Sequence, residues 1–89
     1  MERIGFVMYS VETTEKFDKE FKKLDRYTQK MLKAWIDKNL VGCENPRQHG
    51  KSLTVNRGGQ WKYRVGNCRL ICYINDNELV ILALSVGHR

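Results

Sequence analysis

Three strand-like segments near the end of the sequence, separated by two short turns, constrain its fold most strongly. Residues 60–65, 68–74 and 78–86 are rich in aromatic and branched side chains, which favour strands. Gly66-Asn67 joins the first two segments, and Asn75-Asp76-Asn77 joins the last two. Such short, turn-forming links connect neighbouring antiparallel strands. The sequence therefore predicts a β-meander, and the last strand, apolar on both faces until Ser85, is expected at the centre of the sheet.

The first strand of the meander, residues 60–65, alternates apolar and cationic side chains. Because successive side chains of a strand point to opposite faces, Trp61, Tyr63 and Val65 share one face. We expect this apolar face to pack in the core. Lys62 and Arg64 then share the open face of the sheet.

The second strand of the meander extends this partition across the Gly66-Asn67 turn. Arg69 and Tyr73 are expected on the same face as Lys62 and Arg64. Three side chains of this strand are expected to point into the core: Cys68, Leu70 and Cys72.

The first half of the chain predicts one strand followed by two helices. Residues 3–11 read as a strand with apolar side chains on both faces, which suggests an interior position in the sheet. Thr13 or Thr14 is a candidate cap for a first helix, and Asp25 for a second helix that runs to about Leu40 and ends before Gly42. The apolar positions with helical spacing are Phe17, Phe21 and Leu24 in the first helix, and Met31, Leu32, Trp35, Ile36 and Leu40 in the second.

These segments define the expected architecture. Residues 43–59 form a connection, looped except for a short strand or turn near residues 53–55. The order is then β-α-α-β-β-β, an α+β fold with an antiparallel-rich twisted sheet and an N-terminal helical hairpin. A chain of 89 residues has room for one hydrophobic core, so residues 1–89 are expected to form a single domain.

Positive charge is concentrated in the second half of the chain. The formal net charge is +6, and residues 45–75 contain no Asp or Glu. Residues 13–40, in contrast, mix both signs, as solvated helix faces do. A surface that served only solubility would also mix both signs. The cations of the second half therefore indicate a polyanionic partner. They are Arg47, Lys51, Arg57, Lys62, Arg64 and Arg69.

Other classes of protein fit the sequence less well. The N-terminus lacks the apolar run of a signal peptide, and the longest apolar run, residues 79–84, is too short to span a bilayer, so we expect a cytoplasmic protein. The three cysteines and the two histidines, His49 and His88, lack the spacing of metal ligands. No metal or cofactor is expected. An acid–base pair of His49 and His88 is disfavoured because His49 falls in a predicted loop.

Two motifs resemble the RelE-type bacterial toxins of the RelE/ParE toxin–antitoxin superfamily. The first is the hairpin Tyr63-Arg64-Val65-Gly66-Asn67-Cys68-Arg69-Leu70, and the second is the terminal Val86-Gly87-His88-Arg89. The helix that contains residues 17–24 is also similar to that family. The resemblance covers essentially the whole chain and implies a microbial-RNase-like fold and a cognate antitoxin.

The superfamily offers two targets. RelE-like members are endoribonucleases that cut mRNA in the ribosomal decoding site and inhibit translation, whereas ParE-like members poison DNA gyrase. The resemblance implies a ribosome-dependent nuclease here, because its cationic positions are present together. Carried over residue by residue, these catalytic positions fall on Lys62, Arg64, Arg69, Arg89 and His88. A ParE-like gyrase poison and a passive RNA-binding domain remain the alternatives.

Metal-independent RNA cleavage defines the roles expected of these residues. The ribose 2′-hydroxyl attacks the adjacent phosphate, and the forked guanidinium groups of Arg64 and Arg69 suit the phosphoryl oxygens. Neighbouring cations disfavour the ammonium form of a lysine, so Lys62 is a candidate base. Arg89 or His88 is expected at the leaving oxygen.

RNA binding outside this group is expected from further side chains of the basic half. RelE-like nucleases usually continue past the Gly-x-Arg with a segment that contains a tyrosine, and this sequence ends at Arg89. Tyr73 is a candidate substitute on the cationic face, where it is placed to stack on a base. The predicted RNA-binding residues are Lys51, Arg57, Tyr73 and Arg47.

Overall fold

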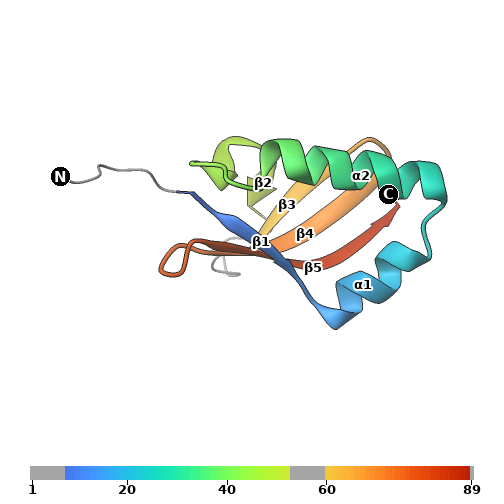
Figure 1. The fold of residues 1–89 in the computed structure, drawn as a ribbon, viewed down its shortest axis with the longest axis horizontal. Helices are drawn as coiled ribbons and strands as arrows, with labels where there is room; N and C mark the ends of the chain where they lie inside the picture. The colour runs from blue at the N-terminus through green and yellow to red at the C-terminus, as the bar shows by residue number, and fades with distance from the viewer. Residues whose placement is uncertain (1–7, 53–59, 89) are drawn as a thin grey trace.

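Within residues 8–52 and 60–88, which the structure describes, the computed structural model forms one five-stranded sheet (Figure 1). Its strands lie in the order β1-β5-β4-β3-β2. The elements along the chain are β1 (Ser10–Thr13), α1 (Glu15–Lys22), α2 (Arg26–Asn39), the short 3-10 helix η1 (Pro46–Gln48), β2 (Lys51–Ser52), β3 (Gln60–Val65), β4 (Cys68–Asn75) and β5 (Val80–His88). This is the α+β fold that the sequence predicts.

The predicted meander is confirmed. β3 pairs antiparallel with β4, and β4 pairs antiparallel with β5. Gly66 adopts a φ of 60° in the first turn, a conformation that glycine reaches without strain. β5 lies between β4 and β1, which confirms the central position expected from its apolar composition.

The expected interior position of the first strand is wrong, because β1 lies at an edge of the sheet. It pairs with β5 alone, in parallel. Most of its side chains are exposed, and Val11 is half-buried. The apolar pattern that suggested an interior strand came mainly from residues before Ser10. Of these, residues 3–7 lie outside the described part of the chain, Met8 is 59% exposed, and Tyr9 packs in the core.

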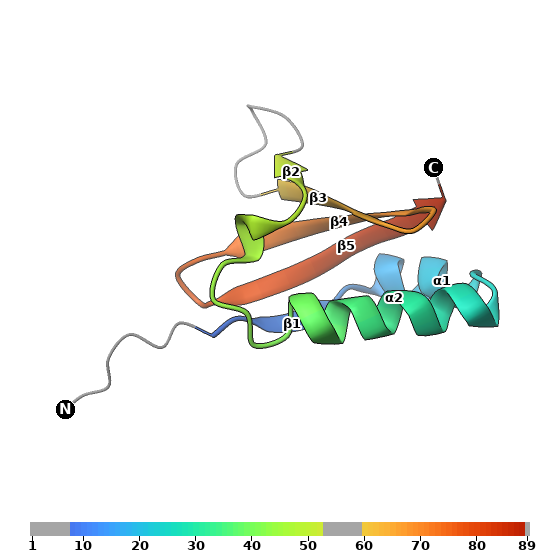
Figure 2. The ribbon, with the colours of Figure 1, turned by 90° about the horizontal axis from the view of Figure 1, so that it is seen from above.

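The two helices begin where the sequence predicts. The hydroxyl oxygen of Thr14 accepts a hydrogen bond from the Phe17 N–H (3.2 Å), and Asp25 accepts one from the Thr28 N–H (3.1 Å). A bond from the Thr28 hydroxyl to Asp25 (2.6 Å), together with this N–H bond, lowers the pKa of Asp25. α2 ends at Asn39, before Gly42 with its φ of 74°. Both helices lie on one side of the sheet (Figure 2).

The core lies between the helices and the meander. Burial of the Cys72 thiol raises its pKa to about 12, so it stays protonated at neutral pH. Cys68 is also a free, buried thiol. The largest fully buried side chains are Tyr63, Leu32, Leu40, Leu70, Ile81, Pro46, Cys68 and Cys72.

Two aromatic side chains of β3 anchor the segment that contains η1. The Tyr63 hydroxyl donates to the Pro46 carbonyl oxygen (2.6 Å), and the Trp61 indole N–H donates to the His49 carbonyl oxygen. This segment then enters β2, whose Lys51 and Ser52 pair with β3. The short strand or turn expected near residues 53–55 lies outside the described residues.

A second contact ties η1 to the turn between β4 and β5. Both guanidinium nitrogens of the Arg47 fork donate to the two carboxylate oxygens of Asp76, each at 3.0 Å. Tyr9 donates its hydroxyl to the same carboxylate (2.6 Å). These bonds, those from Arg47 first, lower the pKa of Asp76. The ring of Trp61 lies under the Arg47 guanidinium, 5.9 Å from its centroid.

The place of Gly50 beside β3 leads to a first prediction. Its φ is 77°, and a Cβ there would lie 2.2 Å from the Lys62 carbonyl oxygen. We expect Gly50→Ala to lower the free energy of unfolding by about 2 kcal/mol or more, as strain at a left-handed position adds to the clash. Urea unfolding measures the change. Gly87→Ala is the matched control, since its Cβ would meet nothing within 4 Å. Equal stability of the two variants would contradict this packing.

The Arg47–Asp76 pair leads to a second prediction. A carboxylate whose pKa is lowered in the folded state stabilises the fold above its unfolded pKa, and this contribution is lost as the pH falls through the folded value. Asp76→Asn should therefore cost about 1 kcal/mol near pH 7, an amount reduced by the exposure of both side chains. The cost should be full at pH 7 and should shrink as the pH falls from about 4, the ordinary pKa of an aspartate, through the lowered pKa of Asp76.

The measurement is urea unfolding of the native and Asp76→Asn proteins across this pH range. Asp37→Asn is the control, because Asp37 pairs with Lys33 on the exposed surface of α2 at 3.4 Å. A cost of Asp76→Asn that does not change with pH, or that equals the cost of Asp37→Asn, would show that the contact does not stabilise the fold.

Candidate functional site

Two pairs of cations stand directly opposite one another on the open face of the sheet. Arg64 of β3 pairs with Arg69 of β4, and Lys62 of β3 pairs with Lys51 of β2. We call these four residues the cationic face. Arg64, Arg69 and Lys51 are exposed, and Lys62 is half-buried. The predicted partition of β3 and β4 is confirmed, because Tyr63, Val65, Cys68, Leu70 and Cys72 are all buried and Trp61 is partly buried against them.

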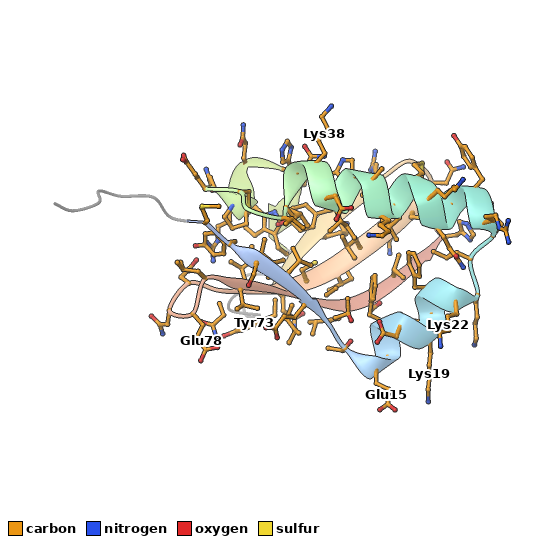
Figure 3. All side chains as sticks on the ribbon, viewed as in Figure 1. Glu15, Lys19, Lys22, Lys38, Tyr73 and Glu78 are labelled. Carbon is orange, nitrogen blue, oxygen red and sulfur yellow. The ribbon has the colours of Figure 1, made fainter. Side chains whose placement is uncertain are left out.

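Tyr73 belongs to the same side of the sheet. It pairs with Gln60, two residues before Lys62, and its side chain is 39% exposed. Figure 3 shows Tyr73 on the side of the sheet away from α2, whereas Lys38 projects from the outer surface of α2. The predicted stacking candidate is therefore on the face that also presents the cations.

Among the described residues, no carboxylate neutralises the charges of the cationic face. Within the described part of the chain, the ion pairs join Lys16 to Glu20, Lys33 to Asp37 and Arg47 to Asp76, and none involves the cationic face. Like charges placed directly opposite in a sheet cost up to about 1 kcal/mol per pair. Binding of a polyanion would remove this repulsion.

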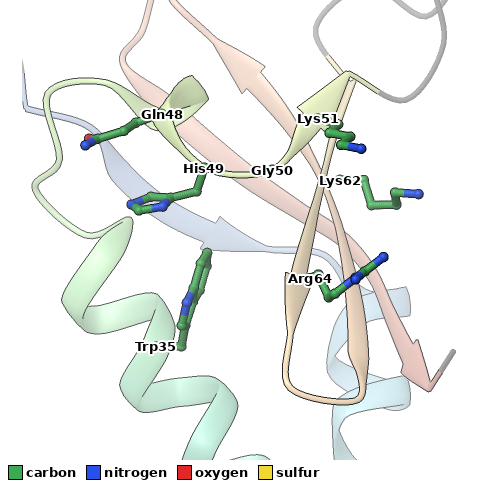
Figure 4. Close-up of a pocket in the computed structure, with 7 residues that line it drawn as sticks. All are labelled: Trp35, Gln48, His49, Gly50, Lys51, Lys62 and Arg64. Atoms are coloured by element: carbon green, nitrogen blue, oxygen red, sulfur yellow. The ribbon is translucent and has the colours of Figure 1, made fainter.

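A pocket of about 550 Å³ adjoins the cationic face at the edge of the sheet formed by β2 and β3. Three of the four cations line it together with one residue of α2 and residues 48–50 (Figure 4). In this view Trp35 and His49 lie on one side, and the cations extend on the other. The lining residues are Trp35, Gln48, His49, Gly50, Lys51, Lys62 and Arg64.

A smaller depression of about 50 Å³ continues the site toward β4. Arg69 lines it with Lys62 and Arg64. All four members of the cationic face therefore contribute to adjoining hollows, which gives an extended cationic surface rather than separate exposed charges.

The structure separates His88 from this group. His88 pairs with Cys68, whose side chain is buried beneath the helices, so His88 lies on the helix side of the sheet. It lines a different pocket, with Tyr27, Thr28 and Met31. The predicted sites Arg57 and Arg89 lie outside the described residues.

Arg47, predicted to bind RNA, forms the ion pair with Asp76 described above. The hydrogen bonds to Asp76 raise the pKa of Arg47. The side chain is therefore placed to hold η1, and through it the residues that follow, against the sheet.

Sequence reasoning missed three residues of the pocket wall: Trp35, Gln48 and His49. Trp35 was assigned only to the apolar stripe of α2, and His49 to a loop and to a disfavoured acid–base pair with His88. Long-range bonds to the Pro46 and His49 carbonyl oxygens hold Gln48 and His49 near β3, and Trp35 packs on the ring of Tyr63. The sequence offered one local signal for these residues. His49 and Gly50 directly precede Lys51, in a stretch without Asp or Glu.

The described residues contain no group of three or more His, Cys, Asp or Glu side chains placed to share a metal ion. No helix among them is both long and apolar enough to span a membrane.

Solved structures of RelE-type toxins resemble this fold over nearly its whole length. A chain of the RelBE2 toxin–antitoxin complex from Mycobacterium tuberculosis has a TM-score of 0.82 and 26% identity, over 96% of this chain and 95% of that chain. The isolated Escherichia coli RelE toxin has a TM-score of 0.72 and 25% identity, over 90% of this chain and 83% of that one.

An archaeal relative shares the fold at lower identity. A chain of the RelE–RelB complex from Pyrococcus horikoshii has a TM-score of 0.69 and 20% identity, over 92% of this chain and 96% of that chain. No curated protein matches the sequence. The family model of the ParE toxin of the type II toxin–antitoxin system parDE matches residues 11–89. The chain therefore belongs to the ParE toxin family of type II toxin–antitoxin systems, within the RelE/ParE superfamily.

Proposed function

We propose that this toxin is a RelE-like, ribosome-dependent endoribonuclease that cleaves mRNA in the decoding site. The observation that carries the proposal is the pair of like-charge contacts, Arg64 with Arg69 and Lys51 with Lys62, on one exposed face. A fold retains such repulsion at the cost of stability, and a phosphate chain is the ligand that offsets it. The likeness to the isolated E. coli RelE toxin supports the same assignment.

The roles of the side chains follow from their chemistry and place. Arg64 and Arg69, directly opposite one another, bind the oxygens of the scissile phosphate and stabilise the charge that gathers there in the transition state. Lys62, flanked by Lys51 and Arg64, takes the proton of the 2′-hydroxyl. His88 lies on the helix side, so stabilisation of the leaving 5′-oxygen is assigned to Arg89, the other terminal residue that the resemblance implies.

The ribosome has a defined part in this proposal. General acid–base and electrostatic contributions of about 10²-fold to 10⁴-fold each give a modest nuclease without positioning. A ribosome that holds mRNA in an in-line geometry supplies the missing orientation. Little cleavage of free RNA is therefore expected from the isolated toxin.

A cognate antitoxin is the second proposed partner. The RelBE2 and P. horikoshii relatives were solved as toxin–antitoxin complexes. With a net charge of +6 and an uncompensated cationic face, this toxin favours an antitoxin segment that carries acidic residues and folds as it binds. Such a segment inhibits by competing with RNA phosphates for the same cations.

The proposed roles are tested by Arg64→Ala in a translation reaction, with the new 5′ ends of mRNA mapped on ribosomes. The native toxin should give cuts in phase with codons and insensitive to chelators. Arg64→Ala should lower the cleavage rate at least about 10²-fold, as loss of one donor to a transition-state oxyanion does. Arg26→Ala, an exposed arginine at the start of α2, is the matched control and should cleave normally. Equal rates for both variants would refute the role of Arg64.

A second candidate function, poisoning of DNA gyrase, is favoured by the family model itself, which is that of ParE toxins. A gyrase supercoiling assay run beside the translation reaction separates the two. Inhibited gyrase with intact mRNA would replace the nuclease proposal. A passive RNA binder would give neither result, yet would still slow translation.

A further inference from the structure

The pocket beside the cationic face has walls of two chemical kinds. On one side stands the half-buried indole of Trp35, and on the other stand Lys51, Lys62 and Arg64 (Figure 4). A ligand that satisfies both walls has a flat ring with polar edges next to an anionic group. A nucleotide has this composition, since every base offers a π-face for an aromatic side chain and every link carries a phosphate.

The aromatic wall is fixed before any ligand arrives. The Trp35 ring packs against the Tyr63 ring at 5.4 Å between centroids and against the His49 ring at 5.9 Å, with interplanar angles of 56° and 68°. The Tyr63 hydroxyl and the Trp61 indole hold the segment that carries His49. A preformed wall of this kind lowers the entropic cost of binding.

The last residue of η1 and the residue that follows it also provide polar groups at the wall. Gln48 has an amide that both donates and accepts, and His49 has two ring nitrogens. These are the groups with which proteins read the edges of unstacked bases. The volume of about 550 Å³ lies within the range of small-molecule sites, about 300–1,000 Å³.

We propose that this pocket binds a single base of the mRNA, next to the phosphate held by Arg64 and Arg69. The proposal rests on the proposed function for the presence of mRNA at the site. Trp35 supplies the stacking surface, Lys51 binds the phosphate attached to the bound nucleotide, and Gln48 with His49 discriminates among bases. Base preference in cleavage then arises in part from the toxin itself.

The test is a titration of the whole chain followed by ¹H–¹⁵N NMR. The chain has two tryptophans, so two indole N–H signals report on Trp35 and Trp61, and Trp35→Phe assigns them. The probes are the four nucleoside 3′-monophosphates and, separately, inorganic phosphate. Nucleotides should shift the Trp35 indole signal with saturation and with different affinities for the four bases. Phosphate alone should shift signals of the cationic residues and leave Trp35 in place.

A variant tests the discriminating wall. Gln48→Ala removes an exposed amide and should change the ratio of affinities among the four nucleotides several-fold, while phosphate binding stays the same. Asn77→Ala, an exposed amide in the turn after β4, is the matched control and should change neither. Equal responses to nucleotides and phosphate, or unchanged ratios in Gln48→Ala, would overturn the proposal.

Two further outcomes keep this proposal distinct from the proposed function. Saturable, base-dependent shifts of the Trp35 indole signal without any mRNA cleavage would refute the proposed nuclease function and would still identify the pocket as a nucleotide site. An acidic peptide that shifts the Trp35 signal where no nucleotide does would assign the pocket to a protein partner and overturn the inference.

Discussion

The hydrogen bond from the Tyr63 hydroxyl to the Pro46 carbonyl oxygen, 2.6 Å long and fully buried, is the contact on which the candidate site depends. The Trp61 indole N–H donates a second hydrogen bond, to the His49 carbonyl oxygen. Together the two bonds hold η1 and His49 against β3. A buried carbonyl left without a donor costs about 1–3 kcal/mol, so the segment has a strong preference for this place. Only then do His49 and Lys51 stand beside Lys62 and Arg64. The same alternation that sends Tyr63 inward sends these two cations outward.

The like charges of the cationic face lower the stability of the sheet that carries them. Arg64 faces Arg69 and Lys51 faces Lys62, and these pairs repel one another in the free protein. The opposite face of the same strands is closely packed, with Tyr63, Leu70 and Cys72 fully buried. One face of the sheet thus stabilises the fold, and the other carries electrostatic repulsion between like charges.

Local patterns in the sequence were sufficient to predict much of this structure. The meander, the helix caps Thr14 and Asp25, and the two faces of β3 and β4 depend on residues close together in the chain, so each left a readable signal. The predicted position of β1 in the sheet was wrong, because strand order depends on pairing between residues about 70 positions apart, such as Ser10 with Val80. The Trp35–His49 wall was missed for the same reason, since the contacts that form it join α2, the segment after η1 and β3.

We propose that the open face of β3 and β4 is the surface that contacts mRNA. A cryo-electron microscopy structure of the toxin on a ribosome, with mRNA in the decoding site and a 2′-deoxynucleotide at the cleavage position to prevent the reaction, tests this proposal most directly. We expect a backbone phosphate within hydrogen-bond distance of Arg64 and Arg69. Messenger RNA bound instead along the helix side, near His88 and Tyr27, or a toxin that does not occupy the decoding site, would contradict it.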